Sequence, residues 1–600
     1  MMMRKLLSYY QKELETLREH GKAFSQLFPK VARRLGFSEG RTEDPHIERL
    51  IESFALLTAQ IHQRLDDDMQ QVTHGLMQTL APQLARTFPS VCIVQLQPQR
   101  KASGMSAVKS LKARLALSSH PIDGQVCQFE TLYPVTLWPA DLTSAELAMD
   151  ANDSWWELSL HFSVWPGATV EDKAVRLHLH GSANHVNTMY ALIGSELRQL
   201  TVIHNGQHID LPVKMVREVG FADDEALFNR DSRVAATHSL LHDYLVFPAK
   251  FHFIDILLPE GFTATAETPF TLHLQFNRCT LTQKLDELCM PVRQDFFRLN
   301  CTPAINLYSR RAEPINLHPH IAEYPVVVDV REQGASFTWS IDRVYIQRTQ
   351  NHQTTSIPVY ALLGLDQANV DAQNGLFWQQ LQHEASNLEV SRQQCRIAFA
   401  DRGGDTLLPE GDVALLDVTC HNGNLPCQMA NGDPRGDFTA ELPLAGVTIH
   451  ALTRPTHQLA APGHSSLRWR LLSQLTLNHI TLSGPQGCKV LKETLALYDF
   501  SHNRAMEPLV NHICSLEVNT VNARLVASDP HSLARGIEIE LTFAADAATE
   551  SEYFLFCRFL DHFLGLYAPV NSFSRLVTQI SSEQSTRCVW PVRAGRLSWI

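Results

Sequence analysis

The chain lacks the features that would place it in a membrane, in an oxidising compartment or on nucleic acid. It has no run of 18 apolar residues, so no membrane-spanning helix is expected. The opening MMMRKLLSYYQKELE becomes polar too early for a secretion signal. The twelve cysteines include no CxxC pair, which favours buried, reduced thiols in the cytoplasm. A net charge of −12 argues against nucleic acid as a partner.

Sequence motifs of catalysis are also absent. The chain contains no GxxxxGK[ST], GxGxxG, GxSxG or HExxH. The run Asp66-Asp67-Asp68 lacks the glycine and the downstream glutamate of a calcium loop, and we expect it to be a polar junction that starts a helix. The search for catalytic motifs therefore argues against an enzyme, and we assign no catalytic residue and no metal site.

Histidine is plentiful, and one cluster leaves an alternative open. In HLHGSANH, His178 and His180 would share one face of a strand, as two zinc ligands could, and His185 follows closely. No cysteine or carboxylate completes the set, so a histidine-rich strand exposed on one side is the favoured interpretation. A bound zinc ion would instead favour a cytosolic metal-dependent hydrolase with a helical lid.

Two cysteines are the best candidates for a nucleophile. Cys301 stands in LNCTP, and Cys420 stands beside His421 in VTCHNG. Neighbours on a strand point to opposite faces, so Cys420 and His421 would not form a pair. We expect both thiols to be buried and structural, and we expect Arg435-Gly436-Asp437 to be an ordinary turn.

The most ordered pattern lies between Leu6 and Leu84, where the sequence predicts three amphipathic helices. The first covers residues 6–28, and the second begins at Asp44 as N-cap with Pro45 at the first helical position. The third runs from about Met69 to Leu84, before Phe88-Pro89. Their apolar residues recur every three or four positions, which makes one stripe per helix and predicts a helical bundle.

Beyond Pro89 short alternating strands dominate. We predict an α+β, multidomain chain: an N-terminal helical bundle segment (1–89), two β-rich domains (90–285 and 286–460) and a mixed α/β C-terminal domain (461–600). The first β-rich domain should be a sandwich or open barrel, with short helices near 186–198 and 238–247 and a hairpin turn at Asn205-Gly206. A helix is predicted at 373–386, and EYFLFCRFLDHFLGLYA predicts a helix buried on all sides.

Several stretches in order resemble one family. SYYQKELETLREHGKAFSQLFPKVARRLG and DPHIERLIESFALLTAQIHQRLDDDM resemble the opening of the TssF (VasA) family, a baseplate subunit of the type VI secretion system. DYLVFPAKFHFIDI, FFRLNCTPAINLYSRRAEPINL, LLDVTCHNGNLP, RGIEIELTF and FLGLYAPVNSFSRLV keep the order of that family. Ala249 departs from the acidic residue expected in FPAKF.

The resemblance implies a structural role without catalysis, cofactor or small-molecule substrate. Family members are similar to contractile-phage baseplate wedge proteins. Two copies of this chain are expected to pair with one TssG-like subunit, with TssK-like and TssE-like subunits attached. Six wedges would surround the spike and carry the tail tube and sheath, in the cytoplasm near the inner membrane. A phage-derived tail baseplate protein outside a secretion system is the alternative.

The helical stripes are the candidate partner-binding site. We expect nine apolar residues to lie in a helical bundle core, either closed within the chain or shared with the TssG-like subunit. These residues are Tyr10, Leu14, Leu17, Leu50, Phe54, Leu57, Ile61, Leu76 and Leu80.

Overall fold

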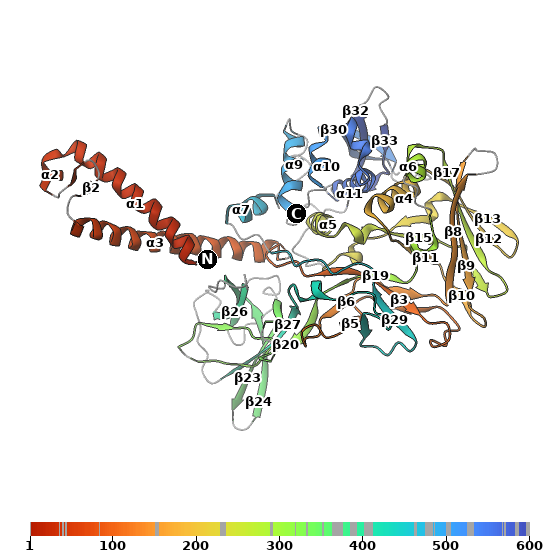
Figure 1. The fold of residues 1–600 in the computed structure, drawn as a ribbon, viewed down its shortest axis with the longest axis horizontal. Coiled ribbons are helices and arrows are strands. Elements are labelled where there is room, and N and C mark those ends of the chain that lie inside the picture. Colours follow the sequence, from red (N-terminus) through yellow and green to blue (C-terminus); the bar gives the residue numbers. More distant parts are fainter. Residues whose placement is uncertain are drawn as a thin grey trace.

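A long helical hairpin projects from a body of β-sheets and helices (Figure 1). The computed structural model describes residues 2–34, 37–38, 41–42, 45–82, 84–149, 155–228, 236–287, 292–318, 320–331, 334–350, 353–362, 376–384, 393–400, 412–460, 465–474, 484, 486–499, 506–524, 533–566, 568, 572–581 and 587–595. Helices and strands are mixed over several structural units, so the predicted α+β multidomain class is confirmed.

The hairpin contains two long helices, α1 (Met2–Leu27) and α3 (Pro45–Leu80). Between them lie the short helix α2 (Pro29–Arg34) and the two-residue strands β1 (Phe37–Ser38) and β2 (Arg41–Thr42), which pair. Pro45 opens α3 as predicted, whereas Asp44 lies outside the described residues.

The predicted break between a second and a third helix at Asp66-Asp67-Asp68 is wrong. Helix α3 is 36 residues long and continues through this run without a break. An aspartate inside a helix costs only about 0.7 kcal/mol or less relative to alanine, which is too little to end a helix that makes contacts on both sides of the run. Asp66 also accepts a 2.5 Å hydrogen bond from the hydroxyl of Tyr9 on α1.

A closed barrel lies at the foot of the hairpin. Going round the barrel, its strands are β19 (Cys301–Ile305), β3 (Val91–Pro98), β29 (Val447–Ala451), β28 (Phe438–Ala440), β5 (Ala116–Ser119) and β6 (Gln128–Thr131). Alternate residues of these strands point inward, and Phe129 meets Phe438 edge to face at 5.2 Å. The barrel takes strands from both predicted β-rich segments, so it crosses the boundary expected near residue 285.

Two further sheets and three helices complete the first β-rich region. One sheet has the order β14 (Val216–Glu218), β15 (Phe253–Leu257), β11 (Ala174–Leu179), β18 (Phe297–Arg298). The other has the order β13 (Gln207–Leu211), β12 (Leu197–His204), β17 (Phe270–Asn277), β9 (Trp155–Val164), β8 (Ala140–Met149). Helices α4 (Ala183–Ser195) and α5 (Ala236–Val246) confirm two predictions, and α6 (Thr280–Glu287) follows β17.

The Asn205-Gly206 turn is confirmed between β12 and β13. Both residues have positive φ, 53° for Asn205 and 72° for Gly206, as a two-residue hairpin turn that follows strand twist requires. Two small pairs of strands, β4 (Lys109–Leu111) with β7 (Val135–Leu137) and β10 (Thr169–Glu171) with β16 (Thr263–Thr265), extend the region.

The C-terminal region shares a hydrophobic core with this region. It contains α7 (Ser465–Gln474), α9 (Gly487–Tyr498), α10 (Met506–Asn511), β30 (Ile513–Arg524), β31 (Leu533–Ala544), α11 (Tyr553–Gly565), β32 (Phe573–Ser581), β33 (Arg587–Val589) and β34 (Arg593–Ala594). Helix α11 is buried along most of its length, as predicted, and Phe559 stacks on Tyr244 of α5 with ring centroids 4.2 Å apart.

The second β-rich unit lies beside the barrel (Figure 1). Its strands are β20 (Tyr308–Arg311), β27 (Val413–His421), β23 (Phe337–Gln350), β24 (Gln353–Ala361), β25 (Phe377–Glu384), β26 (Gln393–Ala400) and β22 (Glu323–Pro325), with β21 (Ile315–Asn316) paired to β27. The helix predicted at 373–386 is wrong where the structure describes it, because Phe377–Glu384 pairs with β26 as a strand. Tertiary pairing outweighed the weak local preference.

Buried amides join this unit to the barrel. The side-chain amide of Asn306 donates to the carbonyl of Gln128 (2.7 Å) and to Oδ1 of Asn422 (2.9 Å). In return, the backbone N–H of Asn422 donates to Oδ1 of Asn306 at 2.7 Å. Both side chains are buried and hydrogen-bonded, which fixes how the two β units meet.

Candidate partner-binding surface

The side of α3 that faces α1 is made of small and polar residues. Ala55, Ala59, His62 and Asp66 lie three, four or seven residues apart and therefore share one face of the helix. His62 Nδ1 lies 2.7 Å from Oε1 of Glu13 on α1, and Ala55 and Ala59 are fully buried. Alanine lets the helix backbones approach closely, while the polar pairs fix their alignment.

A second ion pair spans the hairpin nearer its tip. Arg18 Nη2 lies 2.6 Å from Oε1 of Glu48, with both side chains partly exposed. Exposed ion pairs contribute at most about 1 kcal/mol each, so the contact between α1 and α3 is specific in register but modest in energy. Most of the large apolar side chains of α3 lie outside this contact.

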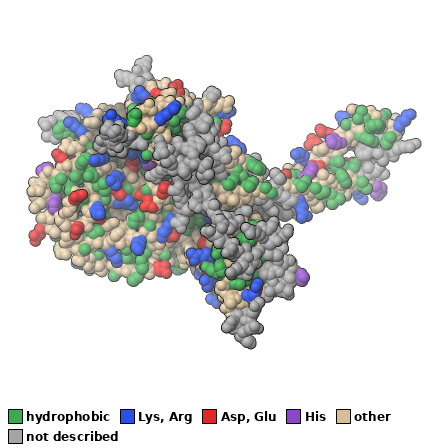
Figure 2. Space-filling model, turned by 180° about the vertical axis from the view of Figure 1, so that it is seen from behind, with side chains coloured by type: hydrophobic (Ala, Val, Ile, Leu, Met, Phe, Trp, Pro, Cys, Tyr) green, Lys and Arg blue, Asp and Glu red, His purple; other side chains and the backbone are tan. Residues whose placement is uncertain are grey.

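Another side of α3, about 100° further round the helix, exposes those apolar side chains. Eight residues share it, and between 40% and 70% of each is exposed to solvent. We call them the α3 stripe: Leu50, Phe54, Leu57, Ile61, Leu65, Val72, Leu76 and Leu80. At a rise of about 1.5 Å per residue, the stripe follows the helix for roughly 45 Å. Hydrophobic side chains are visible along the projecting hairpin in Figure 2.

The predicted bundle residues therefore divide into two sets. Tyr10, Leu14 and Leu17 on α1 are half-buried in the chain itself. The other six, Leu50, Phe54, Leu57, Ile61, Leu76 and Leu80, belong to the α3 stripe and are exposed. Leu65 and Val72 were not among the predicted site residues, although their spacing already placed them on the stripe. The sequence left open whether the bundle closes within the chain or is shared with another protein. In the described part of the chain, these six residues are not covered by another segment.

Two further apolar features on the hairpin were missed. Near its tip, Phe24, Leu27, Phe28 and Val31 are exposed, and the rings of Phe24 and Phe28 lie 5.4 Å apart. A shallow groove of about 450 Å³ is lined by Leu6, Leu7, Tyr10, Arg49, Glu52, Ser53 and Leu56. A monomer seldom exposes a contiguous apolar surface this long unless another protein covers it.

The foot of the hairpin is held firmly. Met77 and Ala81 are buried in the largest hydrophobic core, and α3 packs there against α7. Just beyond, Trp339 Nε1 donates to the carbonyl of Thr87 at 2.9 Å, and Arg86 lies 4.6 Å from the Trp339 ring centre. The hairpin is thus clamped between the C-terminal region and the second β-rich unit. A force applied to the hairpin is therefore transmitted to both of these parts.

Enlarging the buried alanine between the helices should loosen the hairpin. We expect Ala59→Leu to cost about 1–3 kcal/mol, because the added carbons overpack a closely spaced helix pair. Hydrogen–deuterium exchange of the α1 amides should accelerate accordingly. Gln60→Leu is the matched control, since Gln60 is exposed. Equal exchange in Ala59→Leu and wild type would contradict this helix packing.

His74 makes the contact between α3 and α7 dependent on pH. Burial, and then the nearby Arg468, lower the pKa of His74 from 6.5 to about 4. The folded chain therefore keeps His74 neutral, whereas the unfolded chain binds a proton below about pH 6.5. Stability from this residue is complete above pH 6.5 and is lost as the pH falls toward 4.

We expect acidification from pH 7 to pH 5 to cost about 2 kcal/mol through His74. The measurement is the difference in unfolding free energy between wild type and His74→Leu at both pH values, because other buried histidines contribute equally to each protein. The leucine variant should lose less stability. Identical pH dependence in the two proteins would exclude His74 as the cause.

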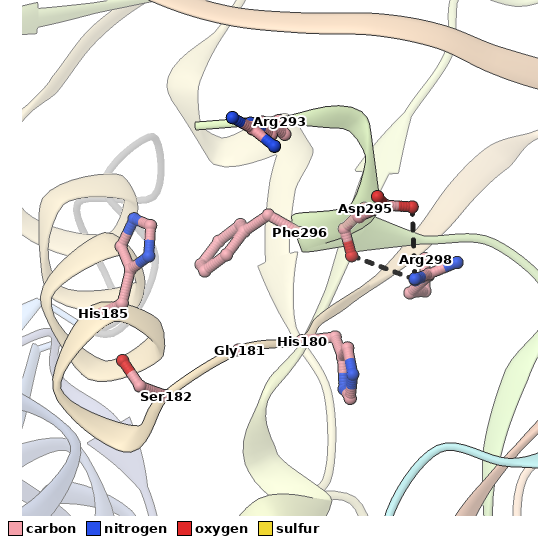
Figure 3. A pocket seen from close by; sticks show the side chains of 8 residues that line it. All are labelled: His180, Gly181, Ser182, His185, Arg293, Asp295, Phe296 and Arg298. Atoms are coloured by element: carbon pink, nitrogen blue, oxygen red, sulfur yellow. Dashed lines mark hydrogen bonds and ion pairs between the residues drawn. The ribbon is translucent and has the colours of Figure 1, made fainter. Parts of the chain in front are cut away.

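The histidine cluster does not gather around one point, because His180 precedes helix α4 whereas His185 lies within it (Figure 3). His178 is buried on β11, so the expectation of an exposed histidine strand is wrong for this residue. Burial and the charges of His252, His180 and Arg298 lower its pKa. Within the described ranges, no three His, Cys, Asp or Glu side chains come close enough to hold a metal ion.

The two candidate nucleophiles are buried. Cys301 lies on β19 and Cys420 on β27, and burial raises the pKa of the Cys301 thiol well above its usual value. A thiol held protonated in this way is a poor nucleophile. In the Arg435-Gly436-Asp437 turn, the buried Asp437 carboxylate accepts backbone hydrogen bonds from Gly432 and Ala451. Both thiols are buried and Arg435-Gly436-Asp437 lies in a turn, as predicted.

No helix in the described part of the chain is both long enough and apolar enough to cross a membrane.

Comparison with known proteins agrees with the architecture. Residues 2–597 match the family described as type VI secretion system, TssF. The type VI secretion system component TssF1 of Pseudomonas aeruginosa is 28% identical over 628 residues, which cover 98% of this chain and 99% of that protein.

Two solved structures share the fold. A chain of a TssK-TssF-TssG baseplate subcomplex of the type VI secretion system, determined by cryo-electron microscopy, superimposes with a TM-score of 0.70 at 22% identity, over 91% of this chain and 99% of that one. A chain of the baseplate complex from the type VI secretion system gives a TM-score of 0.56 at 22% identity, over 98% and 99%.

Proposed function

Because the chain belongs to the TssF family of type VI secretion system components, we propose that it is a structural, non-catalytic subunit of the baseplate wedge. The observation that carries this proposal is the α3 stripe, a long row of apolar side chains that the chain leaves exposed on a projecting, firmly rooted hairpin. A large exposed apolar surface of this kind is typical of a subunit that is covered by a partner in a permanent assembly.

The partner that covers the stripe is a TssG-like subunit. Two copies of this chain join one TssG-like subunit, and TssK-like and TssE-like subunits attach to the wedge. Support comes from the solved relative, whose subcomplex contains TssK, TssF and TssG. Spike and sheath components assemble on the completed ring, in the cytoplasm near the inner membrane.

The spacing of the stripe favours a helical partner. Apolar residues every three or four positions present knobs that fit between the side chains of a second helix. A partner helix laid along α3 would cover the stripe over most of its length, and the tip cluster and the groove offer further contact. Permanent interfaces commonly bury more than about 2,000 Å², which an extended hairpin can supply.

The proposed mechanism is mechanical. The two copies occupy different positions in a wedge. Triggering moves wedges as rigid bodies and frees the sheath to contract. The clamped foot of the hairpin suits this role, because a displacement of the partner is passed to the second β-rich unit and to the C-terminal region together.

Co-expression with the neighbouring TssG-like protein tests the proposal. Light scattering on the purified complex should give two copies of this 67.5 kDa chain per partner. A chain that stays separate from the TssG-like protein, even when the TssK-like and TssE-like proteins are co-expressed, would refute the wedge assignment.

A further inference from the structure

Two cysteines of the C-terminal region approach each other where helix α9 packs against strand β30 (Figure 1). Cys488 lies in the first turn of α9, and Cys514 is the second residue of β30. The Sγ atom of Cys488 lies 3.8 Å from the carbonyl oxygen of Cys514. One turn further along α9, Lys492 Nζ donates to the carbonyl of Asn511 at 3.2 Å, so this face of the helix follows the start of β30. The baseplate role proposed above does not use this pair.

A β-bulge sets Cys514 apart from the rest of its strand. The register of β30 against β31 shifts between Ile513 and Ser515, so no residue of β31 is the register partner of Cys514. A bulge leaves its extra residue unpaired and re-aims the side chain. The Cys514 side chain is exposed, with its Sγ 3.6 Å from the carbonyl oxygen of His512. The sequence favoured buried thiols, and Cys514 departs from that expectation because a small oxidant in water can reach it.

Buried cysteines elsewhere in the described chain are poorly suited to oxidation. Burial raises the pKa of several thiols far above the usual value and so holds them protonated, namely those of Cys92, Cys301, Cys395 and Cys557. Of the described cysteines, Cys514 and Cys588 are the exposed ones. Cys588 lies on β33, which β31 and β32 separate from β30. With about 4.8 Å between neighbouring strands, the resulting gap of roughly 14 Å is too long for a disulfide between Cys588 and Cys514.

We propose that Cys488 and Cys514 are a site of reversible oxidation, at which a peroxide forms a disulfide that ties α9 to β30. The Cys514 thiol gives up its proton, and its sulfur attacks one oxygen of hydrogen peroxide. The O–O bond breaks, which leaves a sulfenic acid and, with that proton, one water. The sulfur of Cys488 then attacks the sulfur of Cys514, and the S–O bond breaks as hydroxide leaves with the Cys488 proton as a second water. Two thiols and one peroxide thus give one disulfide and two waters.

The geometry permits this bond and gives it a consequence. A disulfide needs Cα atoms about 4.4–6.8 Å apart, and the contact of Cys488 Sγ with the main chain of Cys514 is compatible with that span. The exposed Cys514 side chain has to change rotamer, from the His512 carbonyl toward α9, which exposed side chains do readily. Because α9 packs against α7, and α7 against the foot of α3, the bond stiffens the part of the C-terminal region that holds the hairpin.

Peptide mapping of the full-length chain without reductant tests the proposal. The folded chain is treated with hydrogen peroxide, its remaining thiols are alkylated, and it is digested with trypsin. We expect residues 471–489 to be linked to residues 505–524, in a chain that still runs as a monomer on a non-reducing gel, and we expect dithiothreitol to release the two peptides. The site is overturned if peroxide leaves both thiols free, oxidises Cys514 without forming the link, or joins Cys514 to another cysteine or another chain.

Matched variants complete the test. Cys488→Ser should abolish the linked peptides and leave Cys514 as an oxidised acid, because the resolving thiol is gone. Cys588→Ser removes the other exposed thiol and should form the link as wild type does. Should Cys488→Ser fold poorly, the mapping of wild type against Cys588→Ser still decides the outcome.

Hydrogen–deuterium exchange on the oxidised wild-type chain measures the tie between the two elements. Amide exchange in α9 should slow on oxidation and recover on reduction. Equal exchange in the oxidised and reduced chains would overturn the inference that the bond ties α9 to β30. No partner protein is present in either experiment, so the results are independent of the wedge assignment.

Discussion

Leu57→Asp is expected to prevent assembly with the TssG-like subunit while leaving the isolated chain folded. Leu57 lies in the middle of the α3 stripe and is 58% exposed in the chain alone. Substitutions at such exposed positions usually change folding stability by less than about 0.5 kcal/mol. At a helical interface, however, a buried and unpaired carboxylate should cost about 2–4 kcal/mol or more, which corresponds to roughly 30- to 1,000-fold weaker binding.

Co-purification and light scattering on the co-expressed pair measure this loss. Gln60→Asp is the matched control, because it adds the same charge at an exposed position of α3 outside the stripe. The control should assemble like wild type, and both variants should give an unchanged circular dichroism spectrum. If Leu57→Asp assembled normally, the stripe would not be the partner-binding surface.

Lys250→Met is expected to cost about 3–5 kcal/mol of stability, the largest effect we predict for a single substitution. Lys250 Nζ lies 2.7 Å from Oδ2 of Asp243, and the two side chains are 1% and 2% exposed. Nζ also donates to the carbonyl of Glu225 at 3.1 Å, while the same Asp243 oxygen accepts from the N–H of Leu227 at 3.1 Å. Removing the lysine leaves a buried carboxylate without its counter-charge.

A double-mutant cycle separates this pair from simple loss of packing. Lys250→Met combined with Asp243→Asn should lose clearly less than the sum of the two single variants, because neither charge is then left alone. Urea unfolding midpoints give the comparison. Lys489→Met is the control, since Lys489 is exposed and lies 3.9 Å from its partner Glu493. A Lys250→Met chain as stable as this control would contradict the predicted cost of an unpaired buried charge.

Local patterns in the sequence were sufficient to predict several elements of the fold. Apolar residues every three or four positions located α3, and the Asn205-Gly206 pair located a hairpin turn, because both signals depend on neighbouring residues alone. The all-round apolar character of 553–565 correctly predicted a helix buried in a core. The break at Asp66 and the helix at 373–386 failed where packing or strand pairing outweighed weak local preferences.

The sequence by itself determined the class of the chain, the existence and period of the α3 stripe, and the resemblance to its family. Only the tertiary structure decided which side of α3 meets α1. A helical period gives the angle between residues on one helix but not the direction of its neighbour, so Ala55 and Ala59 could not be identified as the inner face beforehand.

The barrel depends on the tertiary structure in the same way. Strand β3 pairs with β19 and with β29, which lie more than 200 and 340 residues further along the chain. Each local segment is compatible with many partners, and only the burial of all their apolar faces at once selects one arrangement.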